Sequence, residues 1–494
     1  MMNKNRGFLP SAGKLICFLM GLVLMAILLP FNAAADEPSE VVVTTEQQLR
    51  EAVRYDGNVI TIAGDIYITD EAIVIDREIT LRGHGTLTSI DKWQWHFTVE
   101  EGGILTLDGD LALIRAQDSD SFGGIRVNNA KLVMHSGLLY GHYFSGGITL
   151  AENSSFYMYG GEIKNNYSRR GTGVAVVEES TFNMYDGLIS GHTGNGVYVS
   201  RNSVFNMHGG VISDNSAGGG VVVYRSSIFN MYGGEISGNN ALHGGGVSVS
   251  EGSEFFMHGG VISGNSAGFG GGVFISWCQW LRTSLFVFFE GSITNNTAQY
   301  QGGGIASRSH LVVYGGEITN NEANREGGGI YISTNAAYAF IQGVKISDNI
   351  AHRHGGGIYN GVGAILSIAD SEITGNTALR DGGGLYTQNY HNLRIREDVI
   401  FRDNSSSRAH NFGIWAGSEQ FPLIKWSGEN SVPNTHLKNN HDISYTGVWM
   451  PSIWVACIVI ALIIIAIKLT VTIYCLKKER KKVEPEQAEV GDAL

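Results

Sequence analysis

The sequence predicts an all-β protein, a right-handed parallel β-helix built as a single-stranded solenoid, with an N-terminal cap and one transmembrane α-helix after it. Of the 494 residues, 67 are glycine and 7 are proline, which is about twice the usual share of glycine. A motif of about 25 residues recurs along the chain, which is typical of a solenoid. Within each copy the apolar residues alternate with period two, which indicates strands.

Residues 1–35 have the features of a secretory signal peptide. A positively charged start precedes the apolar stretch Leu15–Leu29, and the alanines Ala33–Ala35 supply a small-residue cleavage site before Asp36. An uncleaved signal anchor is the alternative. Of the four cysteines only Cys278 lies outside the terminal apolar segments. We therefore expect no intramolecular disulfide and a fold stabilised by packing.

Residues 36–131 are predicted to form the N-terminal cap and the first turns. A short helix is expected over Thr45–Val53, because Thr45 is followed three residues later by Gln48, the spacing of a capping box. This helix would cover the open end of the solenoid, where strand edges are otherwise exposed. Four apolar runs predict strands: Val59–Ile62, Ile66–Ile68, Ile79–Leu81 and Leu105–Leu107.

Residues 132–414 carry the regular repeat. The copies align on one apolar anchor position: Leu139, Ile163, Ile189, Ile212, Ile236, Ile262, Ile293, Ile318, Ile346, Ile373 and Phe401. Each copy contains three short strands, of the types Phe-x-Met, Gly-x-Ile and Val-x-Val. Each strand is expected to pair with its equivalent one turn away at ~4.8 Å, so that about fourteen turns make a rod of roughly 65 Å.

Two further columns accompany the repeat, one of asparagines and one of glycine runs. Three residues past the anchor an asparagine recurs, which predicts a ladder of side-chain amides; His142 and His192 take its place in two copies. The ladder asparagines are Asn166, Asn215, Asn239, Asn265, Asn296, Asn321, Asn349, Asn376 and Asn404. Runs of three glycines precede the Val-x-Val strands and predict a turn with positive φ. They are Gly218–Gly220, Gly244–Gly246, Gly270–Gly272, Gly302–Gly304, Gly327–Gly329, Gly355–Gly357 and Gly382–Gly384.

The C-terminal part lacks the repeat. Residues 415–447 are predicted to form a distal cap and a stalk, in which Val432–His436 is similar to a sortase sorting signal. Residues 448–475 are predicted to be a transmembrane helix, since they open with a run of apolar residues long enough to span the hydrocarbon core. Residues 476–494 begin with a basic cluster, which predicts a cytoplasmic tail and a single-pass type I topology with the solenoid outside.

The repeat resembles a known family. The segments Phe205–Asn215 and Phe229–Asn239 read FNMHGGVISDN and FNMYGGEISGN, and they are similar to the polymorphic outer-membrane protein repeat. More broadly, the stretch from Leu132 to about Ile414 resembles the pectin-lyase-like β-helix superfamily. The resemblance implies an adhesin-like protein of the cell surface.

A column of rings lies four residues before the anchor. Its members are His135, Tyr159, Tyr185, His208, Tyr232, His258, Phe289 and Tyr314. They alternate with the inward methionines, so we expect them to face solvent. At ~4.8 Å per turn the rings either stack on one another or present a strip to a sugar or a protein. A metal site is not expected, because Tyr232 separates His208 from His258.

A second candidate column consists of arginines four residues past the ladder: Arg325, Arg353, Arg380 and Arg408. One residue further on, the same turns carry Glu326, His354 and Asp381. Stacked arginines repel unless they are counter-charged. Three alternatives follow: neutralisation by the neighbouring acids, a binding site for acidic glycans, or acid/base catalysis by Glu326, His354 and Asp381.

Enzymes of the β-helix class are the runner-up prediction. Polygalacturonases combine a Gly-His-Gly motif with an Arg-Ile-Lys motif, and this chain has Gly83–Gly85 and, close to the second motif, Arg394–Arg396. The two are far apart in sequence, and the clustered aspartates of that family are missing. A glycoside hydrolase needs two carboxylates in proximity, which the slot before the anchor does not offer: Lys345 separates Glu317 from Glu372.

The functional prediction is therefore a membrane-anchored, adhesin-like surface protein that binds a glycan or another cell-surface partner through an exposed face. A polysaccharide lyase or glycoside hydrolase is the first alternative and a passive spacer the second. The net charge of −12 and the lack of a basic stripe argue against a nucleic-acid partner. No cofactor is predicted.

Overall fold

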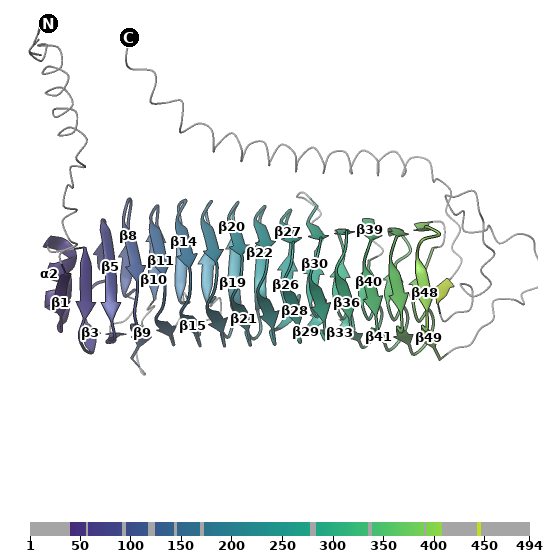
Figure 1. The fold of residues 1–494 in the computed structure, drawn as a ribbon, viewed down its shortest axis with the longest axis horizontal. Coiled ribbons are helices and arrows are strands. Elements are labelled where there is room, and N and C mark those ends of the chain that lie inside the picture. The colour runs from purple at the N-terminus through teal and green to yellow at the C-terminus, as the bar shows by residue number, and fades with distance from the viewer. Residues whose placement is uncertain are drawn as a thin grey trace, which may run out of the picture.

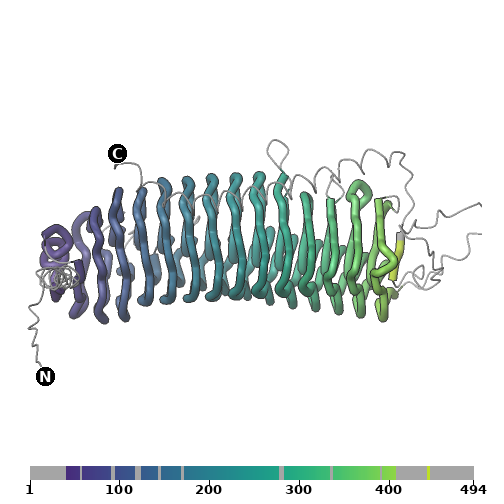
Figure 2. The backbone as a smooth tube through the Cα atoms, turned by 45° about the horizontal axis from the view of Figure 1, so that its top comes forward, coloured from purple at the N-terminus to yellow at the C-terminus, as the bar shows by residue number. Residues whose placement is uncertain are grey.

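The computed structural model describes residues 40–55, 58–90, 95–116, 124–142, 146–167, 172–276, 283–333, 338–389, 392–407 and 442–445. In this part the chain forms a parallel β-solenoid of a dozen or more turns, stacked into a rod (Figures 1 and 2). The described part is mostly β and confirms the predicted parallel β-solenoid, whereas the right-handed winding stays a prediction.

Several sequence predictions fall outside the described residues. They are the signal peptide over residues 1–35, Cys278, Arg408, the sortase-like segment Val432–His436, the span over residues 448–475 and the tail over residues 476–494. Within the described ranges, no helix has both the length and the apolar character needed to cross a membrane.

Three long parallel sheets form the walls of the rod, and each turn adds one strand to each of them. Sheet A holds the Phe-x-Met strands: β1 (Glu40–Val43), β2 (Val59–Ile62), β5 (Glu78–Gly83), β8 (Ile104–Leu107), β11 (Lys131–Met134), β14 (Ser155–Met158), β17 (Thr181–Met184), β20 (Val204–Met207), β23 (Ile228–Met231), β27 (Glu254–Met257), β31 (Leu285–Phe288), β35 (His310–Val313), β39 (Tyr338–Gln342), β43 (Ile365–Ala369) and β47 (Leu393–Ile395).

Sheet B holds the Gly-x-Ile strands: β3 (Ile66–Ile68), β6 (Thr86–Ser89), β9 (Ala112–Arg115), β12 (Leu138–Tyr140), β15 (Glu162–Lys164), β18 (Leu188–Ser190), β21 (Val211–Ser213), β24 (Glu235–Ser237), β28 (Val261–Ser263), β32 (Ser292–Thr294), β36 (Glu317–Thr319), β40 (Lys345–Ser347), β44 (Glu372–Thr374) and β48 (Ile400–Arg402).

Sheet C holds the Val-x-Val strands: β4 (Ile73–Ile75), β7 (Phe97–Val99), β10 (Ile125–Asn128), β13 (Ile148–Ala151), β16 (Val174–Val176), β19 (Asn195–Ser200), β22 (Gly219–Tyr224), β26 (Val247–Val249), β30 (Val273–Ile275), β34 (Ile305–Ser307), β38 (Ile330–Ile332), β42 (Ile358–Asn360), β46 (Leu385–Thr387) and β50 (Ile443–Tyr445).

A fourth, seven-stranded sheet was not predicted. Sheet D lies between sheets B and C in the C-terminal half of the rod, directly after the ladder asparagines. Its strands are β25 (Asn240–His243), β29 (Ser266–Phe269), β33 (Thr297–Gln301), β37 (Glu322–Ala323), β41 (Ile350–Ala351), β45 (Thr377–Ala378) and β49 (Ser405–Ser406). These strands hold the turn residues that follow them in register from one turn to the next.

The core is continuous along the rod because the inward residues of the three long sheets stack on their own equivalents. Six phenylalanines at one equivalent position of successive sheet A strands are buried, and neighbouring ring centroids lie 4.6–4.9 Å apart. They are Phe156, Phe182, Phe205, Phe229, Phe255 and Phe286. Each turn therefore completes its hydrophobic contacts only when both neighbouring turns are present.

Helix α2 (Glu46–Tyr55) covers the N-terminal end of the rod (Figure 1), as predicted. Leu49, Ala52 and Val53 are buried. The backbone N–H of Gln48 donates to Thr45 Oγ1 at 3.3 Å, so Thr45 is the N-cap residue. The second half of the capping box differs from the prediction: Gln48 Oε1 accepts from the backbone N–H of Thr44 at 2.9 Å.

The asparagine ladder is confirmed. The backbone N–H of each ladder residue from Asn215 to Asn376 donates to the side-chain oxygen of the next ladder asparagine, as in Asn239 to Asn265 at 3.0 Å. The amide of Asn239 also donates to the carbonyl of Ile212 in the preceding turn at 3.0 Å. At the C-terminal end Asn404 donates to Asp442 Oδ1 at 2.9 Å, immediately before β50. This strand falls in the segment expected to form the distal cap.

A serine ladder at the turn from sheet C to sheet A was missed by the sequence analysis. The backbone N–H of Ser154 donates to Ser180 Oγ at 3.1 Å, and that of Ser180 donates to Ser203 Oγ at 3.2 Å. Ser227 and Ser253 continue the pattern. The predicted glycine turns are confirmed, since the first glycine of the runs from Gly244 onward has φ between +64° and +71°.

Candidate functional site

The ring column forms a continuous strip on the surface, at the end of the sheet A strands and before the corner that leads to sheet B. We call it the ring strip: His135, Tyr159, Tyr185, His208, Tyr232, His258, Phe289 and Tyr314. Neighbouring rings are stacked, with centroids 4.7–5.7 Å apart and interplanar angles of 6–17°. The outward orientation is as predicted, and of the two alternatives for the rings the structure shows mutual stacking.

Stacking decides what the ring strip offers to a ligand. The ring faces lie against one another, so only the ring edges, the phenolic hydroxyls and the imidazole edges are presented outward. Tyr159 and Tyr232 are 45% and 44% exposed. Burial lowers the pKa of His258 below its usual value, which favours the neutral ring near pH 7. Among the described residues, no group of three or more His, Cys, Asp or Glu side chains is placed to hold a metal ion.

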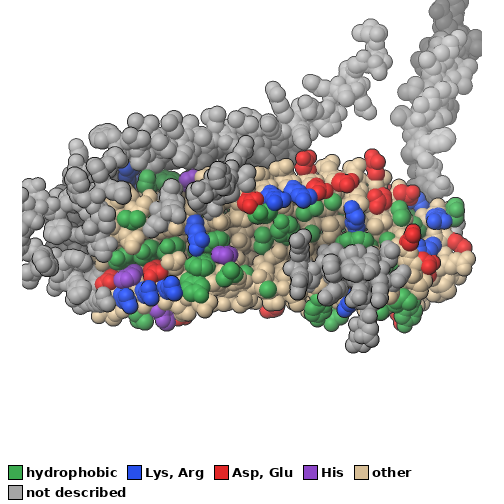
Figure 3. Space-filling view, turned by 180° about the vertical axis from the view of Figure 1, so that it is seen from behind, with side chains coloured by type: hydrophobic (Ala, Val, Ile, Leu, Met, Phe, Trp, Pro, Cys, Tyr) green, Lys and Arg blue, Asp and Glu red, His purple; other side chains and the backbone are tan. Residues whose placement is uncertain are grey.

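A second candidate surface is the arginine corner, made of Arg325, Arg353 and Arg380 at the turn that follows sheet D. The backbone N–H of Arg353 donates to the carbonyl of Arg325 at 2.9 Å, and that of Arg380 to the carbonyl of Arg353 at 2.8 Å. The three arginines therefore occupy equivalent positions on successive turns, and all three are exposed. Figure 3 shows Lys and Arg side chains gathered beside acidic and histidine side chains on this view of the rod.

The predicted acid/base set lies next to the arginine corner and is brought together by the fold. Glu326, His354 and Asp381 follow one another on successive turns, linked through backbone hydrogen bonds of the glycine runs. His354 Nδ1 lies 3.1 Å from Asp381 Oδ2. Glu326 Oε2 accepts from Gln301 Nε2 at 3.0 Å. All three acid/base candidates are half-buried.

A tyrosine row on the outer face of sheet C borders this set, and the sequence analysis missed it. Tyr331, Tyr359 and Tyr386 stack with centroids 5.1 and 5.3 Å apart and are 6–9% exposed. The His354 ring lies 4.6 Å from that of Tyr386. Burial raises the pKa of Tyr331 and Tyr359, which keeps these phenols protonated. The signal was present in the sequence, since a tyrosine recurs at the middle position of β38, β42 and β46.

The two motifs shared with polygalacturonases do not form one site. Gly83 ends β5, while Arg394 and Ile395 belong to β47, and these strands are twelve positions apart in sheet A. At ~4.8 Å per strand the separation is about 58 Å. The two short motifs are therefore too far apart in this fold to form one active site.

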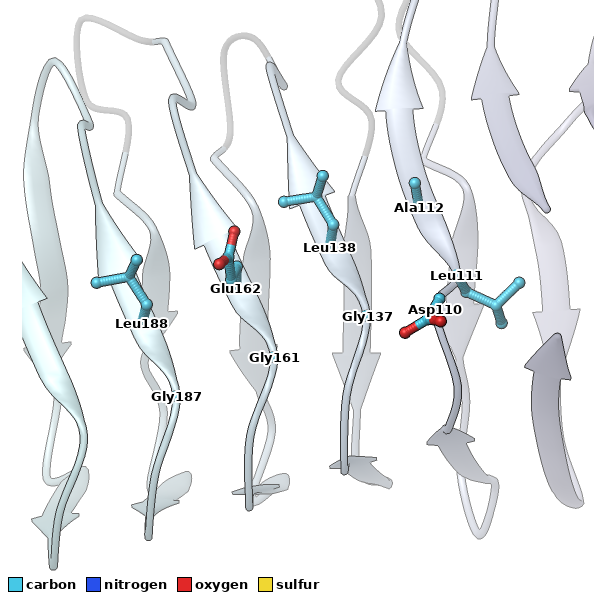
Figure 4. A pocket seen from close by; sticks show the side chains of 9 residues that line it. All are labelled: Asp110, Leu111, Ala112, Gly137, Leu138, Gly161, Glu162, Gly187 and Leu188. Atoms are coloured by element: carbon cyan, nitrogen blue, oxygen red, sulfur yellow. The ribbon is translucent and has the colours of Figure 1, made fainter. Parts of the chain in front are cut away.

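A shallow groove of about 510 Å³ lies along the corner between sheets A and B in the N-terminal half (Figure 4). Gly137, Gly161 and Gly187 stand in a row at the starts of β12, β15 and β18, and the side chains of Leu138, Glu162 and Leu188 follow them (Figure 4). A Cβ atom at Gly161 would lie 2.4 Å from Met134 Cε. These glycines are therefore required by the core, and the groove follows from their packing.

Comparison with known proteins adds no relative: no protein-family model, no curated protein and no solved structure matches this chain. The fold and the surfaces described above define a parallel β-solenoid protein with several ordered side-chain columns on its exterior. The family resemblance of its repeat stays a prediction.

Proposed function

We propose that this chain is an adhesin-like protein of the cell surface, anchored by one membrane span, whose solenoid binds a glycan or another surface through the ring strip. The signal-peptide features of residues 1–35 and the apolar run in residues 448–475 support the anchored topology. The resemblance of the repeat to the polymorphic outer-membrane protein repeat supports an adhesin-like role.

The observation that carries this proposal is the ring strip. Eight rings in register extend over about 34 Å at ~4.8 Å per turn, a length that suits an extended ligand. Exposed aromatic surface of this extent is typical of interaction sites, and tyrosine supplies contact area together with a hydroxyl for hydrogen bonding. Because stacking already fixes each ring, a ligand meets a preorganised surface and little ordering entropy is lost on binding.

The test is binding of the full chain, held in detergent micelles, to an array of neutral and charged glycans. We expect retention on a subset of the neutral glycans and at least tenfold weaker binding for Tyr232→Ala. Tyr67→Ala is the matched control, because Tyr67 is 60% exposed on β3 and lies outside the ring strip. Equal losses of binding for the two variants, or no retention on any glycan of the array, contradict the ring-strip proposal and favour a spacer.

An enzymatic role is the second candidate, favoured by the contact between His354 and Asp381. Glu326 and Asp381 lie two turns apart in one column, about 9.6 Å at ~4.8 Å per turn, near the upper end of the carboxylate separation in inverting glycosidases. Release of reducing or unsaturated ends from a polysaccharide, abolished by Asp381→Asn, would establish this activity. Unchanged release in Asp381→Asn would exclude the acid/base set as its source.

Membrane anchoring is tested separately. We expect the full chain to remain in the membrane fraction after carbonate extraction at high pH, and a variant lacking residues 448–494 to be released into the medium. Extraction of the full chain by carbonate would contradict the predicted span.

A further inference from the structure

The arginine corner carries more positive charge than its surroundings neutralise. The Arg325 guanidinium lies 4.8 Å from the centre of the Tyr300 ring, a cation–π contact that orients it without cancelling its charge. Arg353 Nη1 is 3.6 Å from Glu326 Oε1. Arg380 forms no ion pair with any described residue. Among the described residues, the three guanidinium groups of the corner therefore have a single carboxylate partner, Glu326.

The other acids nearby are already engaged. Asp381 faces His354 at 3.1 Å, and Glu322 Oε1 lies 2.6 Å from His352 Nε2. Among the described arginines of this column, neutralisation by a neighbouring acid, one of the three alternatives, thus holds only for Arg353. Two like charges about 5 Å apart repel by roughly 0.8 kcal/mol even in bulk water, and a bound anion relieves this repulsion.

The spacing of the corner specifies the ligand. Sheet D strands pair in register directly before the arginines, so cationic groups repeat every ~4.8 Å along a straight line. Guanidinium groups bind carboxylates and sulfates with two parallel hydrogen bonds. The matching ligand is a linear polymer with an acidic group on each of several successive units.

We propose that the arginine corner binds a linear acidic polysaccharide through its carboxylates or sulfates. This site lies between sheets B and C, whereas the ring strip lies between sheets A and B, so it is a second binding surface of the rod. This inference rests on the proposed adhesin-like function only in placing the arginine corner outside the cell, where such polysaccharides occur. Binding of uncharged glycans reports on the ring strip, and salt-sensitive binding of charged glycans reports on the arginine corner.

The experiment measures the Kd of the full chain in detergent micelles for a polyuronate, a sulfated glycan and neutral dextran, at 50 and 200 mM NaCl. The test variant is Arg325→Gln/Arg353→Gln/Arg380→Gln. The matched control is Arg201→Gln/Arg225→Gln, which removes two exposed arginines at the turn from sheet C to sheet A, where Glu178 and Glu251 already pair with them.

We expect at least one acidic polymer to bind, dextran to remain unbound at this site, and the triple variant to bind the acidic polymer at least tenfold more weakly. The control variant should change the Kd less than threefold, and Arg353→Lys should bind more weakly than the wild type because it loses the planar fork. A carboxylate polymer that binds better than the sulfated one, or the reverse, identifies the acidic group.

Three outcomes would overturn the proposal: no salt-sensitive binding of either acidic polymer, an equal loss in the control variant, or binding of the acidic polymer that the triple variant leaves intact. Thermal unfolding of each variant within about 2 °C of the wild type rules out misfolding as the cause, since all five arginines are exposed and surface substitutions have small effects on stability.

Discussion

At the scale of single residues, His192 shows how the ladder tolerates a different side chain. Its Nδ1 accepts from the backbone N–H of Asn166 at 3.1 Å, as an asparagine oxygen does. Its Nε2 lies 3.0 Å from the carbonyl of Ile163 in the preceding turn. This contact is equivalent to the hydrogen bond from Asn239 Nδ2 to the carbonyl of Ile212. The neutral imidazole thus reproduces these two hydrogen bonds of a ladder asparagine, but only as long as Nδ1 carries no proton.

The first prediction concerns His192→Asn and acid stability. Burial lowers the pKa of His192 to about 4 from 6.5. Above pH 6.5 the ring is neutral in both the folded and unfolded states; between pH 6.5 and about 4 the unfolded chain binds the proton, so stability falls by up to about 3 kcal/mol. We expect His192→Asn to narrow the difference in Tm between pH 7.5 and pH 4.5.

Asn215→His is the reciprocal control, since it places a histidine in the next ladder position and should widen that difference. Burial also lowers the pKa of His96 to about 4, so some acid sensitivity will persist in both variants. An identical Tm difference in the wild type and in His192→Asn would contradict the prediction.

The second prediction is a graded series of glycine substitutions. Gly234 has φ +85°, and a Cβ there would lie 2.6 Å from Met207 Cε in the core. Gly102 has φ +80° but nothing within 4 Å, and Gly64 has open space with no positive φ. We expect Gly64→Ala to be neutral, Gly102→Ala to cost about 1 kcal/mol from backbone strain, and Gly234→Ala to cost several kcal/mol.

Urea unfolding of the three variants measures this order of losses in the free energy of unfolding. Equal losses for Gly102→Ala and Gly234→Ala would mean that the core relaxes around Met207 and that strain alone requires the glycine.

At the scale of elements, the period-two pattern was sufficient to place most strands. β2 and β3 begin and end at the predicted residues, and the outward ring column and the ladder followed from spacing alone. Sheet D was not predictable, because strands such as β37 and β41 are two residues long and carry no alternation. Their backbone is extended because the ladder asparagines before them and the glycine turns after them hold the chain in register.

For the candidate sites, the sequence predicted which residues share a column but not which side chains contact one another. Counting from the anchor placed Glu326, His354 and Asp381 in one column, which the structure shows. It did not reveal that Glu326 faces Gln301 or that Asp381 faces His354, because side-chain rotamers depend on the neighbouring sheet. The charge balance at the arginine corner therefore required the structure.

The third prediction concerns the attachment of helix α2. Arg77 Nε and Nη2 donate to the carbonyls of Val53 and Ala52, both at 2.9 Å, and so satisfy the C-terminal end of the helix. We expect Arg77→Gln to destabilise α2 by about 2 kcal/mol and to raise amide exchange across the helix, while exchange in the central turns is unchanged.

Arg82→Gln is the control, because Arg82 pairs with Glu40 on the surface at 2.7 Å with both side chains 44% exposed, and such pairs contribute little. Equal exchange of the α2 amides in the two variants would show that apolar burial of the helix, rather than Arg77, holds the cap in place.

At the scale of the whole molecule, each turn contacts only the turn before it and the turn after it, as the strand order in every sheet shows. Stability of such a rod is approximately a sum of the stabilities of single turns and of the interfaces between neighbours. A local defect weakens the interface between two neighbouring turns. If the lost interface energy exceeds the energy that couples the two sides of the defect, these two parts of the rod unfold separately.

The fourth prediction applies this to Phe205, which is fully buried and stacks 4.8 Å from Phe182 and 4.9 Å from Phe229. Phe205→Ala removes ring contacts to both neighbouring turns at a cost of about 3–5 kcal/mol. We expect the urea unfolding curve to broaden or split, with amides on the two sides of β20 becoming exchangeable at different urea concentrations. Phe205→Leu keeps most of the buried area and should restore a steeper transition. A Phe205→Ala curve that shifts to lower urea with an unchanged slope would instead show that the rod unfolds as one cooperative unit, with coupling between turns stronger than the loss of two stacked rings.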